Sequence, residues 1–295
     1  MKGCIVCNNY YRTPKMEEQA DRFVRLFADR GVRMRTVYAG EIAPVVGADI
    51  RLPPEVSESG FALFWDKDAL LAAALEAAGL AVFNSARALA DCDDKRRTHL
   101  ILARAGLPCP ETLFAPLTYP AFAEPDPLFL REVGRKLGFP LVVKEAFGSY
   151  GEQVFLARDP EELLALHSRL IHRPHLFQRF VRESAGRDVR VVVVGGRAAA
   201  AMERENPNDF RANVSHGGKM KPLEPRGEIA DLAVRAARAL GLDYGGVDLL
   251  LSDRGPLICE VNSNAHIRNI LDCTGVDVAA LFADHILDRV GRREA

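Results

Sequence analysis

Gly246-Val-Asp-Leu-Leu-Leu-Ser252, Asp253-Arg254-Gly255 and Pro256-Leu-Ile-Cys-Glu-Val-Asn262 follow one another as an apolar run, a turn and a second apolar run. Glycine at the last turn position suits the left-handed backbone that such a turn requires. We therefore predict a β-hairpin with a three-residue turn. If Ser252 opposes Pro256, Asp248 lies directly across from Glu260, and strand alternation places Asn262 on the same face. The opposite face, directed into a core, would carry Leu249, Leu251, Leu257, Cys259 and Val261.

The three oxygen-bearing side chains of this hairpin suggest a metal site. Two carboxylates directly opposite each other on a sheet repel, and a bound cation removes that repulsion. Carboxylate and amide oxygens are hard ligands of the kind that Mg²⁺ prefers, usually one or two carboxylates together with substrate phosphates. The alternative is an ordinary polar face of an exposed hairpin. The hairpin alone does not decide between the two.

A second pattern predicts a phosphate-binding loop. The apolar run Phe139-Pro-Leu-Val-Val-Lys144 ends in a lysine, and Phe147-Gly-Ser-Tyr-Gly-Glu152 follows. Two glycines let backbone N–H groups approach an anion, and a preceding lysine supplies a point charge. The spacing differs from G-x-x-x-x-G-K-[ST], which excludes a P-loop enzyme. A plain hairpin turn is the alternative for this loop. Lys95, which begins a predicted helix within Asp93-Asp94-Lys95-Arg96-Arg97, belongs by itself to a solvated charge cluster.

Composition restricts the class of protein. The chain has 295 residues, enough for two or three domains. It is 48% hydrophobic and 27% charged, as in ordinary soluble proteins. A net charge of −1 gives no bulk attraction to nucleic acid or to an anionic membrane. No apolar run reaches the roughly 20 residues that span a bilayer, and the first apolar stretch is too short for a signal peptide. We expect a cytoplasmic protein that binds neither membrane nor nucleic acid.

The six cysteines are scattered along the chain, and we expect free thiols in a reducing compartment. Cys4 and Cys7 form a lone C-x-x-C on a predicted strand. We interpret them as small core residues; a redox pair or half of a zinc site is the alternative.

Secondary-structure patterns divide the chain into three parts. Strands at 2–7, 33–38, 60–65 and 81–83 alternate with helices at 16–30 and 69–78, which predicts a small parallel α/β domain over 1–90. It lacks the G-x-G-x-x-G of dinucleotide-binding folds. Residues 86–105 are rich in helix formers and charge, and the proline-rich stretch 115–127 reads as an extended connection. Helices at 128–137 and 160–170 with strands at 141–144 and 154–157 form an α+β unit, within 91–175. The third part, 176–295, consists of predicted strands together with helices at 228–240 and 276–290.

Beyond residue 84 the sequence resembles the ATP-grasp superfamily, and specifically the RimK-like family of ribosomal protein S6 modification enzymes and α-L-glutamate ligases. The matching pieces occur in the family's order, and as an ordered set they are specific. They are Asn84-Ser85, Asp94-Lys95 with Thr98, Gly106-Leu-Pro-Cys-Pro-Glu-Thr112, Phe139–Lys144, Gly148–Gly151, Gln178–Val181, Gly186-Arg-Asp-Val-Arg190, Glu203-Arg204, Asp209–Asn213, Gly217-Gly218, Gly246–Asp248, Glu260–Asn262 and Thr274–Asp277.

This resemblance implies an ATP-grasp fold, in which two α+β subdomains clasp ATP, preceded by the small parallel α/β domain. It implies an ADP-forming carboxylate–amine ligase that uses ATP and Mg²⁺, with Mn²⁺ as an alternative ion. Substrates would be a small-molecule carboxylate and amine, or a peptide or protein C-terminus, and a homo-oligomer is compatible with the family.

The resemblance also assigns roles to residues. Lys95 and Lys144 would contact the ATP phosphates under a loop that includes Gly148, Ser149, Tyr150 and Gly151. Gln178, Phe180 and Val181 would lie at the adenine, with Glu183 or Asp188 near the ribose. Asp248, Glu260 and Asn262 would hold the metal ions. Arg190, Arg204, Arg211 and Asn213 would surround the transferring phosphate and the acyl group.

Two features leave alternatives open. In an ideal hairpin with Gly195-Gly196 as its turn, Arg190 and Arg204 point to opposite faces, and both reach one substrate only if a bulge or the strand end redirects one of them. After Asn262 the chain reads Ser-Asn-Ala-His-Ile-Arg-Asn269, where the family usually has a Pro-Gly turn, so the sequence does not identify glutamate as a substrate. Another ATP-grasp ligase and a regulatory ATP-binding protein without turnover are the alternatives. His216 is interpreted as a loop histidine.

Overall fold

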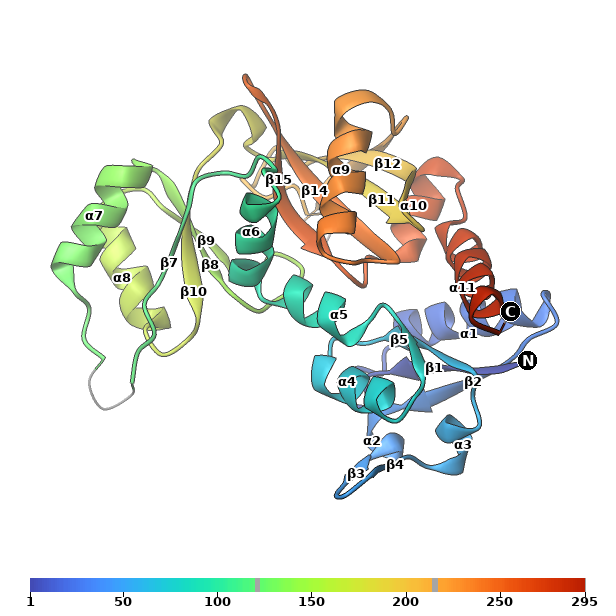
Figure 1. The fold of residues 1–295 in the computed structure, drawn as a ribbon. Coiled ribbons are helices and arrows are strands. Elements are labelled where there is room, and N and C mark those ends of the chain that lie inside the picture. Colours follow the sequence, from blue (N-terminus) through green and yellow to red (C-terminus); the bar gives the residue numbers. More distant parts are fainter. Residues whose placement is uncertain (120–122, 214–216, 295) are drawn as a thin grey trace.

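The computed structural model describes residues 1–119, 123–213 and 217–294, so Pro120 and His216 lie outside the described residues. Three larger sheets carry the fold, with one small two-stranded sheet beside them (Figure 1). The first and third larger sheets lie within the predicted ranges 1–90 and 176–295, whereas the middle sheet extends beyond 91–175 as far as Arg179. The division into three domains stays a prediction. No helix in the described part of the chain is long and apolar enough to cross a membrane.

The first sheet is parallel, with strand order β2-β1-β5-β6. Its strands are β1 (Lys2–Cys7), β2 (Arg33–Tyr38), β5 (Phe61–Trp65) and β6 (Ala81–Phe83), and its main helices are α1 (Pro14–Ala28) and α4 (Ala69–Ala77). Thr13 caps α1 and Pro14 opens it, while Phe23 and Phe27 are buried against the sheet. Between β2 and β5 lie α2 (Ala39–Ile42), β3 (Val45–Val46), β4 (Ile50–Arg51) and α3 (Pro54–Ser57). The predicted parallel α/β arrangement is confirmed.

Cys4 and Cys7 are both buried and free, as the core interpretation requires. Cys4 packs into the cluster on one side of β1, and Cys7 into the cluster on the other side. Side chains three apart on a strand point to opposite faces. The two sulfurs therefore cannot form a redox pair or bind one metal ion.

The stretch 86–105, rich in helix formers, forms two helices, α5 (Ala86–Asp93) and α6 (Lys95–Arg104), and Lys95 begins a helix as predicted. Asp94 between them has extended backbone (φ −87°, ψ 104°), and its carboxylate accepts a hydrogen bond from the Arg96 N–H at 2.9 Å. An aspartate side chain that satisfies the backbone locally competes with helix continuation and caps the next helix. The break makes Lys95 the first residue of α6.

The middle sheet is antiparallel, with order β7-β10-β8-β9. It consists of β7 (Thr112–Phe114), β8 (Leu141–Glu145), β9 (Val154–Ala157) and β10 (His175–Arg179). Helices α7 (Pro127–Leu137) and α8 (Pro160–Leu170) cover one face, where Leu141 and Val143 point (Figure 1). Because strand side chains alternate, Val142 and Lys144 point to the other face.

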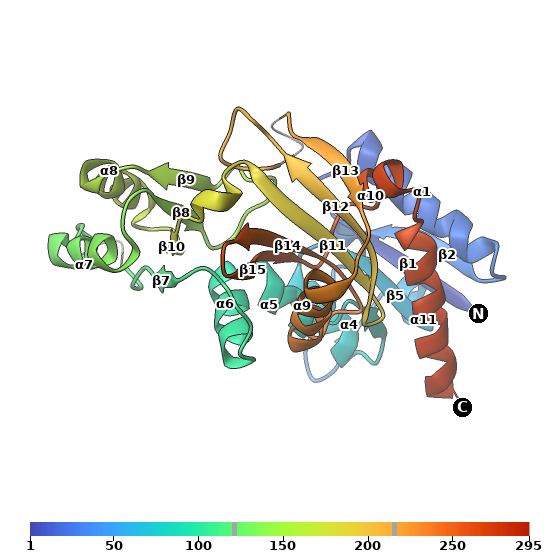
Figure 2. The same ribbon diagram turned by 90° about the horizontal axis from the view of Figure 1, so that it is seen from above.

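The third sheet has order β13-β12-β11-β14-β15. Its strands are β11 (Arg187–Val194), β12 (Arg197–Glu205), β13 (Lys219–Leu223), β14 (Tyr244–Ser252) and β15 (Gly255–Asn262), and the short helix η2 (Arg182–Ser184) precedes them. Helix α9 (Gly227–Ala239) packs on one face. Helices α10 (Ile267–Thr274) and α11 (Val278–Glu294) lie at part of the other face, and α11 runs beside α1 (Figure 2). Phe23, Tyr244 and Phe282 join the first and third sheets in one core.

Asn84 is the polar link between these two sheets. Its buried amide donates to the carbonyls of Tyr244 and Ser263 at 2.8 and 2.9 Å, and its oxygen accepts from the N–H groups of Asp243 and Tyr244 at 2.8 and 3.0 Å. We expect Asn84→Ala to lower the unfolding free energy by about 3–5 kcal/mol, because buried partners lose their hydrogen bonds. Urea unfolding measures this. The exposed Asn208→Ala is the control, and an equal effect of both substitutions would contradict the assigned link.

The buried His99 and His167 and the partly buried His266 predict acid sensitivity. Burial lowers the pKa of His99 to about 3 and the pKa values of His167 and His266 to about 4. The unfolded chain, with histidine pKa values near ~6.5, binds more protons than the folded chain below that pH. The contribution of these neutral histidines to the unfolding free energy is therefore complete above pH ~6.5, and it is lost as the pH falls toward 4.

Urea melts at a series of pH values should show this loss, which for His99 alone is about 1.4 kcal/mol per pH unit. His99→Gln should flatten the slope, and the exposed His172→Gln should leave it unchanged. An unchanged slope in His99→Gln would refute the assignment.

Candidate active site

The hairpin β14–β15 has a two-residue turn, in which Ser252 pairs with Gly255, so the predicted three-residue turn is wrong. A register shift between Asp248 and Leu249 adds one residue to β15 and restores the predicted pairing of Asp248 with Glu260. Asn262 pairs with Gly246 on the same face. The bulge thus replaces the longer turn as the reason why these groups converge.

The bulge also changes which hairpin residues reach the core. Leu249 and Val261 are buried as predicted, but Ile258 takes the core position predicted for Leu257 and Cys259. Leu251 is 40% exposed near the hairpin tip, which corrects its assignment to the core. Cys259 lies on the opposite side, where its sulfur accepts a hydrogen bond from Lys144 Nζ at 3.4 Å. One added residue reverses the faces of all residues between it and the turn.

A second bulge redirects Arg204. The pairs Val194–Arg197 and Val193–Ala198 begin the β11–β12 hairpin in ideal register, and a shift between Val192 and Val193 then adds a residue to β12. Beyond it Arg190 pairs with Met202, and Asp188 with Arg204. Arg190 and Arg204 therefore share a face, as the predicted alternative with a bulge requires.

The two arginines and two aspartates form a buried charge cluster. Arg190 Nε and Nη2 each lie 2.6 Å from an Asp248 oxygen. Arg204 binds Asp188 in the same two-pronged way, at 2.7 and 2.5 Å, and its Nη2 lies 3.0 Å from Asp248 Oδ2. Burial alone would raise the pKa of Asp248, but Arg190 and Arg204 outweigh it and hold that pKa below its usual range. Asp248 is therefore an anion at neutral pH.

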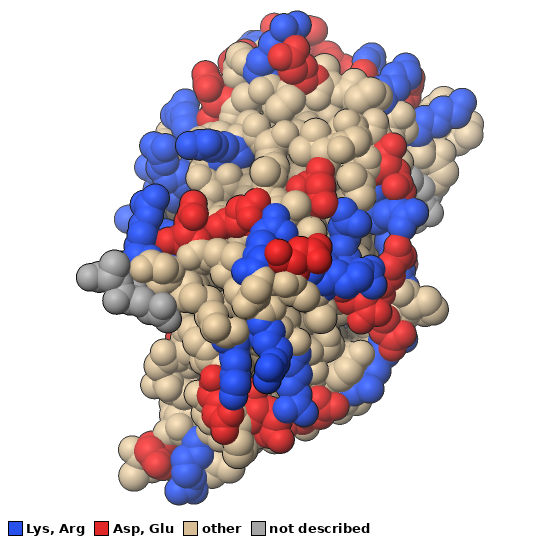
Figure 3. Space-filling view, turned by 90° about the vertical axis from the view of Figure 1, so that its right-hand side faces the viewer, with Lys and Arg blue, Asp and Glu red and all other residues tan. Residues whose placement is uncertain are grey.

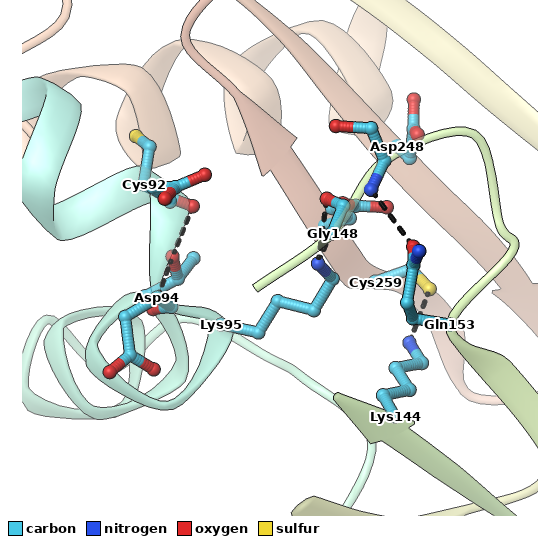
Figure 4. A network of polar contacts seen from close by, with 12 residues as sticks. Cys92, Asp94, Lys95, Lys144, Gly148, Gln153, Asp248 and Cys259 are labelled. Carbon is cyan, nitrogen blue, oxygen red and sulfur yellow. Dashed lines mark hydrogen bonds and ion pairs between the residues drawn. The ribbon is translucent and has the colours of Figure 1, made fainter. Parts of the chain in front are cut away.

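Two lysines approach this cluster from other elements (Figure 4). Lys144 comes from β8, and Lys95 from the start of α6, where its Nζ donates to the Gly148 carbonyl at 3.3 Å and lies 3.5 Å from Glu260. Both lysines are buried, with 6% and 8% exposure. The alternative that Lys95 belongs to a solvated charge cluster is thus wrong. The Lys95 side chain points inward, because the helix break at Asp94 sets its direction.

The loop between β8 and β9 arches beside the same groups. Gly148 (φ 147°) and Gly151 (φ 77°) have backbone that side chains disfavour, and a Cβ on Gly151 would lie 2.9 Å from Asn213 Oδ1. Arg211 holds the loop by donating to the Gly151 carbonyl at 2.6 Å while pairing with Asp209. The loop thus connects the antiparallel strands β8 and β9 and is braced by Arg211, and its role at a phosphate stays a prediction.

Between the middle and third sheets lies a cavity, which we call the inter-sheet cavity. It gathers most of the predicted residues: Lys144, Gly151, Gln178, Phe180, Val181, Asp188, Arg204, Arg211, Asn213, Asp248 and Glu260 line it. The Gln178 side chain donates to Thr112 Oγ1 at 3.0 Å and lies 3.1 Å from His99 Nε2. Glu183 is exposed and lines neither this cavity nor the next.

A neighbouring cavity of about 400 Å³, which we call the Asp66 cavity, takes further predicted residues. Ser149, Tyr150, Arg190 and Asn262 line it, and Asn213 lines both cavities. Lys95 and Gly148, which contact each other, line neither cavity. The charge cluster lies where the two cavities adjoin, because Arg190 faces one and its partner Asp248 the other.

Sequence analysis missed the residues that the first sheet contributes to the Asp66 cavity. They are Asn8, Tyr11, Trp65, Asp66 and Lys67, and Asn264 and His266 join them from the segment after β15. Asn8 and Asp66 directly follow the parallel strands β1 and β5. Polar residues at the carboxyl ends of parallel strands commonly mark a ligand site, which is the signal that could have found them.

Comparison with known proteins agrees with this geometry. The family model of the RimK-like ATP-grasp domain matches residues 92–286. Beta-citrylglutamate synthase B of Danio rerio is 35% identical over 267 residues, 88% of this chain and 64% of that protein. A probable alpha-L-glutamate ligase of Parasynechococcus marenigrum (strain WH8102) is 36% identical over 220 residues, 73% of this chain and 45% of that protein. The matches thus span less than two thirds of these relatives.

Among solved structures, the ATP-grasp ligase PsnB complexed with minimal precursor, Mg and ADP is similar at a TM-score of 0.70, with 19% identity and 98% of both chains covered. This likeness confirms the predicted ATP-grasp fold. The family match over most of the chain confirms the resemblance seen in the ordered motifs. This chain belongs to the RimK-like ATP-grasp family.

Proposed function

We propose that this protein is an ATP- and Mg²⁺-dependent carboxylate–amine ligase that forms an amide or peptide bond through an acyl phosphate. The observation that carries the proposal is the charge cluster of Arg190, Arg204, Asp188 and Asp248 between two adjoining cavities. One cavity has Lys144 and Gly151 of the glycine loop, which suit a nucleotide, and the other has room for a second reactant. ATP binding alone does not need the second cavity.

The oxygen groups of the hairpin fit a magnesium ion. Asp248 and Glu260 are anionic ligands of the expected number, and Asn262 supplies an amide oxygen while its buried Nδ2 has no hydrogen-bond partner among the described residues. Arg190 and Arg204 pair with Asp248, and Lys95 lies near Glu260, so a bound Mg²⁺ would compete with these cations for the two carboxylates. When bound, Mg²⁺ would neutralise phosphate charge and orient the γ-phosphate; Mn²⁺ offers the same coordination chemistry. PsnB, with the same fold, binds Mg and ADP.

The chain's own residues supply charge and orientation. Lys95 and Lys144 would bind ATP phosphates, with Gly148, Ser149, Tyr150 and Gly151 covering them. Arg190, Arg204, Arg211 and Asn213 would bind the transferring phosphate and the acyl group. Attack of the substrate carboxylate on the γ-phosphorus releases ADP, and the amine then displaces phosphate. The first step depends on positioning and charge stabilisation more than on covalent catalysis.

The nucleotide base would lie against Phe180 and Val181 in the inter-sheet cavity. Asp188 is the better of the two predicted ribose partners, because Glu183 lines neither cavity, although both carboxylate oxygens of Asp188 are bound to Arg204. Gln178 acts through backbone groups, since its side chain is held by Thr112 and His99.

The substrates would be a small carboxylate and amine, or a peptide or protein C-terminus. Glutamate, which the relatives' names indicate, is one candidate. On the face shown in Figure 3, acidic and basic side chains are interspersed without a large patch of one sign, in keeping with a protein that does not bind nucleic acid. Six free cysteines favour a reducing, cytoplasmic location. A homo-oligomer is compatible with these features.

The test is ADP release from Mg²⁺–ATP against a panel of amino acids, peptides and carrier acids, with mass spectrometry of the products. The proposal expects ADP only when a particular carboxylate and amine are both present, and a product that is heavier by one amide linkage. Tight ATP binding without ADP formation across the panel would instead favour a regulatory nucleotide-binding protein.

A further inference from the structure

Asp66, which follows β5 and lines the Asp66 cavity, is a buried carboxylate without a cationic partner among the described residues. It is 9% exposed. Its oxygens accept hydrogen bonds from Asn8 Nδ2, at 3.1 Å each, and from the Lys67 N–H at 2.7 Å. No ion pair involves Asp66 within residues 1–119, 123–213 and 217–294. Burial raises the pKa of Asp66, as expected of a carboxylate that lacks a neutralising group.

The cations near this carboxylate are bound to other groups. Lys67 Nζ lies 3.1 Å from Asp93 and 3.0 Å from Ser149 Oγ, whereas Lys67 contacts the Asp66 carboxylate through its backbone N–H. Arg190 is bound to Asp248 through both Nε and Nη2. His266 is neutral at pH 7, because burial lowers its pKa to about 4. The described part of the cavity wall therefore leaves the charge of Asp66 unmatched.

A second acceptor lines the same cavity. Asn264 donates its Nδ2 to the Asp66 backbone carbonyl at 2.6 Å, which fixes the orientation of its amide. The other end, Oδ1, is buried and has no hydrogen-bond donor among the described residues. A primary ammonium group has three N–H donors and one positive charge, so it can serve both Asn264 and Asp66. Buried groups of this kind are costly when left unpaired.

Aromatic walls favour the same occupant. Trp65, Tyr11 and Tyr150 line the cavity, and Tyr150 is held in place by stacking on His266 and by hydrogen bonding to it at 2.9 Å. Ring faces attract cations. With a volume of about 400 Å³, the cavity fits an amino acid or the end of a peptide and excludes a folded domain.

We propose that the Asp66 cavity binds the ammonium group of an amino-acid or peptide substrate, with Asp66 and Asn264 accepting its N–H groups. This inference rests on the proposed function, because it names the class of one ligase substrate. The ammonium group could belong to the amine acceptor, in which case it must lose a proton before attack, or to the α-amino end of the carboxylate donor.

Binding can be tested without turnover. Thermal shift in Mg²⁺ and the non-hydrolysable β,γ-imido analogue of ATP would be measured with the common amino acids, a set of dipeptides, and the N-acetyl derivative of each. We expect at least one free amine to stabilise the protein and its N-acetyl form to fail. Equal stabilisation by an N-acetyl form, or none by any free amine, would overturn the proposal. Absence of ADP release would refute the proposed function without affecting this readout.

Asp66→Asn should weaken binding of that amine about tenfold or more, because a charge-assisted hydrogen bond becomes neutral. Stabilisation by the nucleotide analogue should remain, which also shows that the variant folds. Asp68→Asn is the matched control: it makes the same change two residues away, on the surface, and asparagine also caps α4. Amine affinity within twofold of wild type in Asp66→Asn would overturn the proposal.

Steady-state kinetics of Asp66→Asn then separate the two sources of the ammonium group. A raised KM for the amine substrate alone identifies the acceptor. A raised KM for the carboxylate substrate alone identifies the donor's α-amino end. Unchanged KM values for both would count against any ammonium site at Asp66.

Discussion

Turnover should fall about 1,000-fold when Asp248 is replaced by asparagine, with the fold retained. Asp248 pairs with Glu260 across the hairpin and receives both Arg190 and Arg204, so its charge organises the metal ligands and the arginines together. Loss of one preorganised electrostatic group in an active site typically reduces kcat by about 10²–10³. Because the substitution also removes a proposed metal ligand, we expect the reduction in kcat at the upper end of this range.

The measurement is ADP release under saturating Mg²⁺–ATP, with circular dichroism to verify folding. Asp253→Asn, at the exposed tip of the same hairpin, is the control and should keep full activity. The double variant Asp248→Asn and Glu260→Gln should have no detectable turnover. A normally active double variant would exclude this hairpin as the metal site.

Arg204→Met should lower the unfolding free energy by about 3–5 kcal/mol. Its side chain is 4% exposed and neutralises two buried carboxylates, Asp188 and Asp248. Methionine fills a similar volume but leaves Asp188 without its ion-pair partner. Removing one partner of a buried pair is strongly destabilising, because the remaining charge is left desolvated.

The test compares the unfolding free energies of Arg204→Met and Arg187→Met, measured by urea unfolding. Arg187 lies on the paired strand and forms an exposed ion pair with Glu203, so its loss should change stability by less than about 1 kcal/mol. If the two variants unfold at the same urea concentration, the buried cluster does not stabilise the fold as we infer.

The sequence predicted the strands of the first sheet almost to the residue, since β1 and β2 match their expected bounds and β5 and α4 differ by one. Local signals suffice there, because capping residues, glycines after helices and short apolar runs all act over a few positions. The helix start predicted at Lys95 is confirmed, although the composition of residues 86–105 alone does not show where one helix ends and the next begins, because Asp94 could either continue a helix or cap one. Only the packing that buries Lys95 beside Gly148 selects the cap.

The candidate site was predictable in its chemistry and less so in its geometry. Asp248 lies across from Glu260 as expected, although a two-residue turn and a bulge at Cys259 produce that pairing instead of a three-residue turn. Arg204 joins Arg190 because of a bulge in β12 that no residue in the sequence announces. Asp66 and Asn264, about 200 residues apart in the chain, meet only because the first and third sheets share a core.

The sequence by itself determined the family and the sheet-forming segments, and it indicated the groups that we propose bind ATP phosphates and Mg²⁺, because these depend on residue types at short spacings. The tertiary structure alone decided the registers of both hairpins, and with them which side chains face the charge cluster. It also decided that Asp66 has no cationic partner in the described part of its cavity. The physical reason is that register and burial follow from packing between distant segments, which adds or omits a bulge wherever the core requires it.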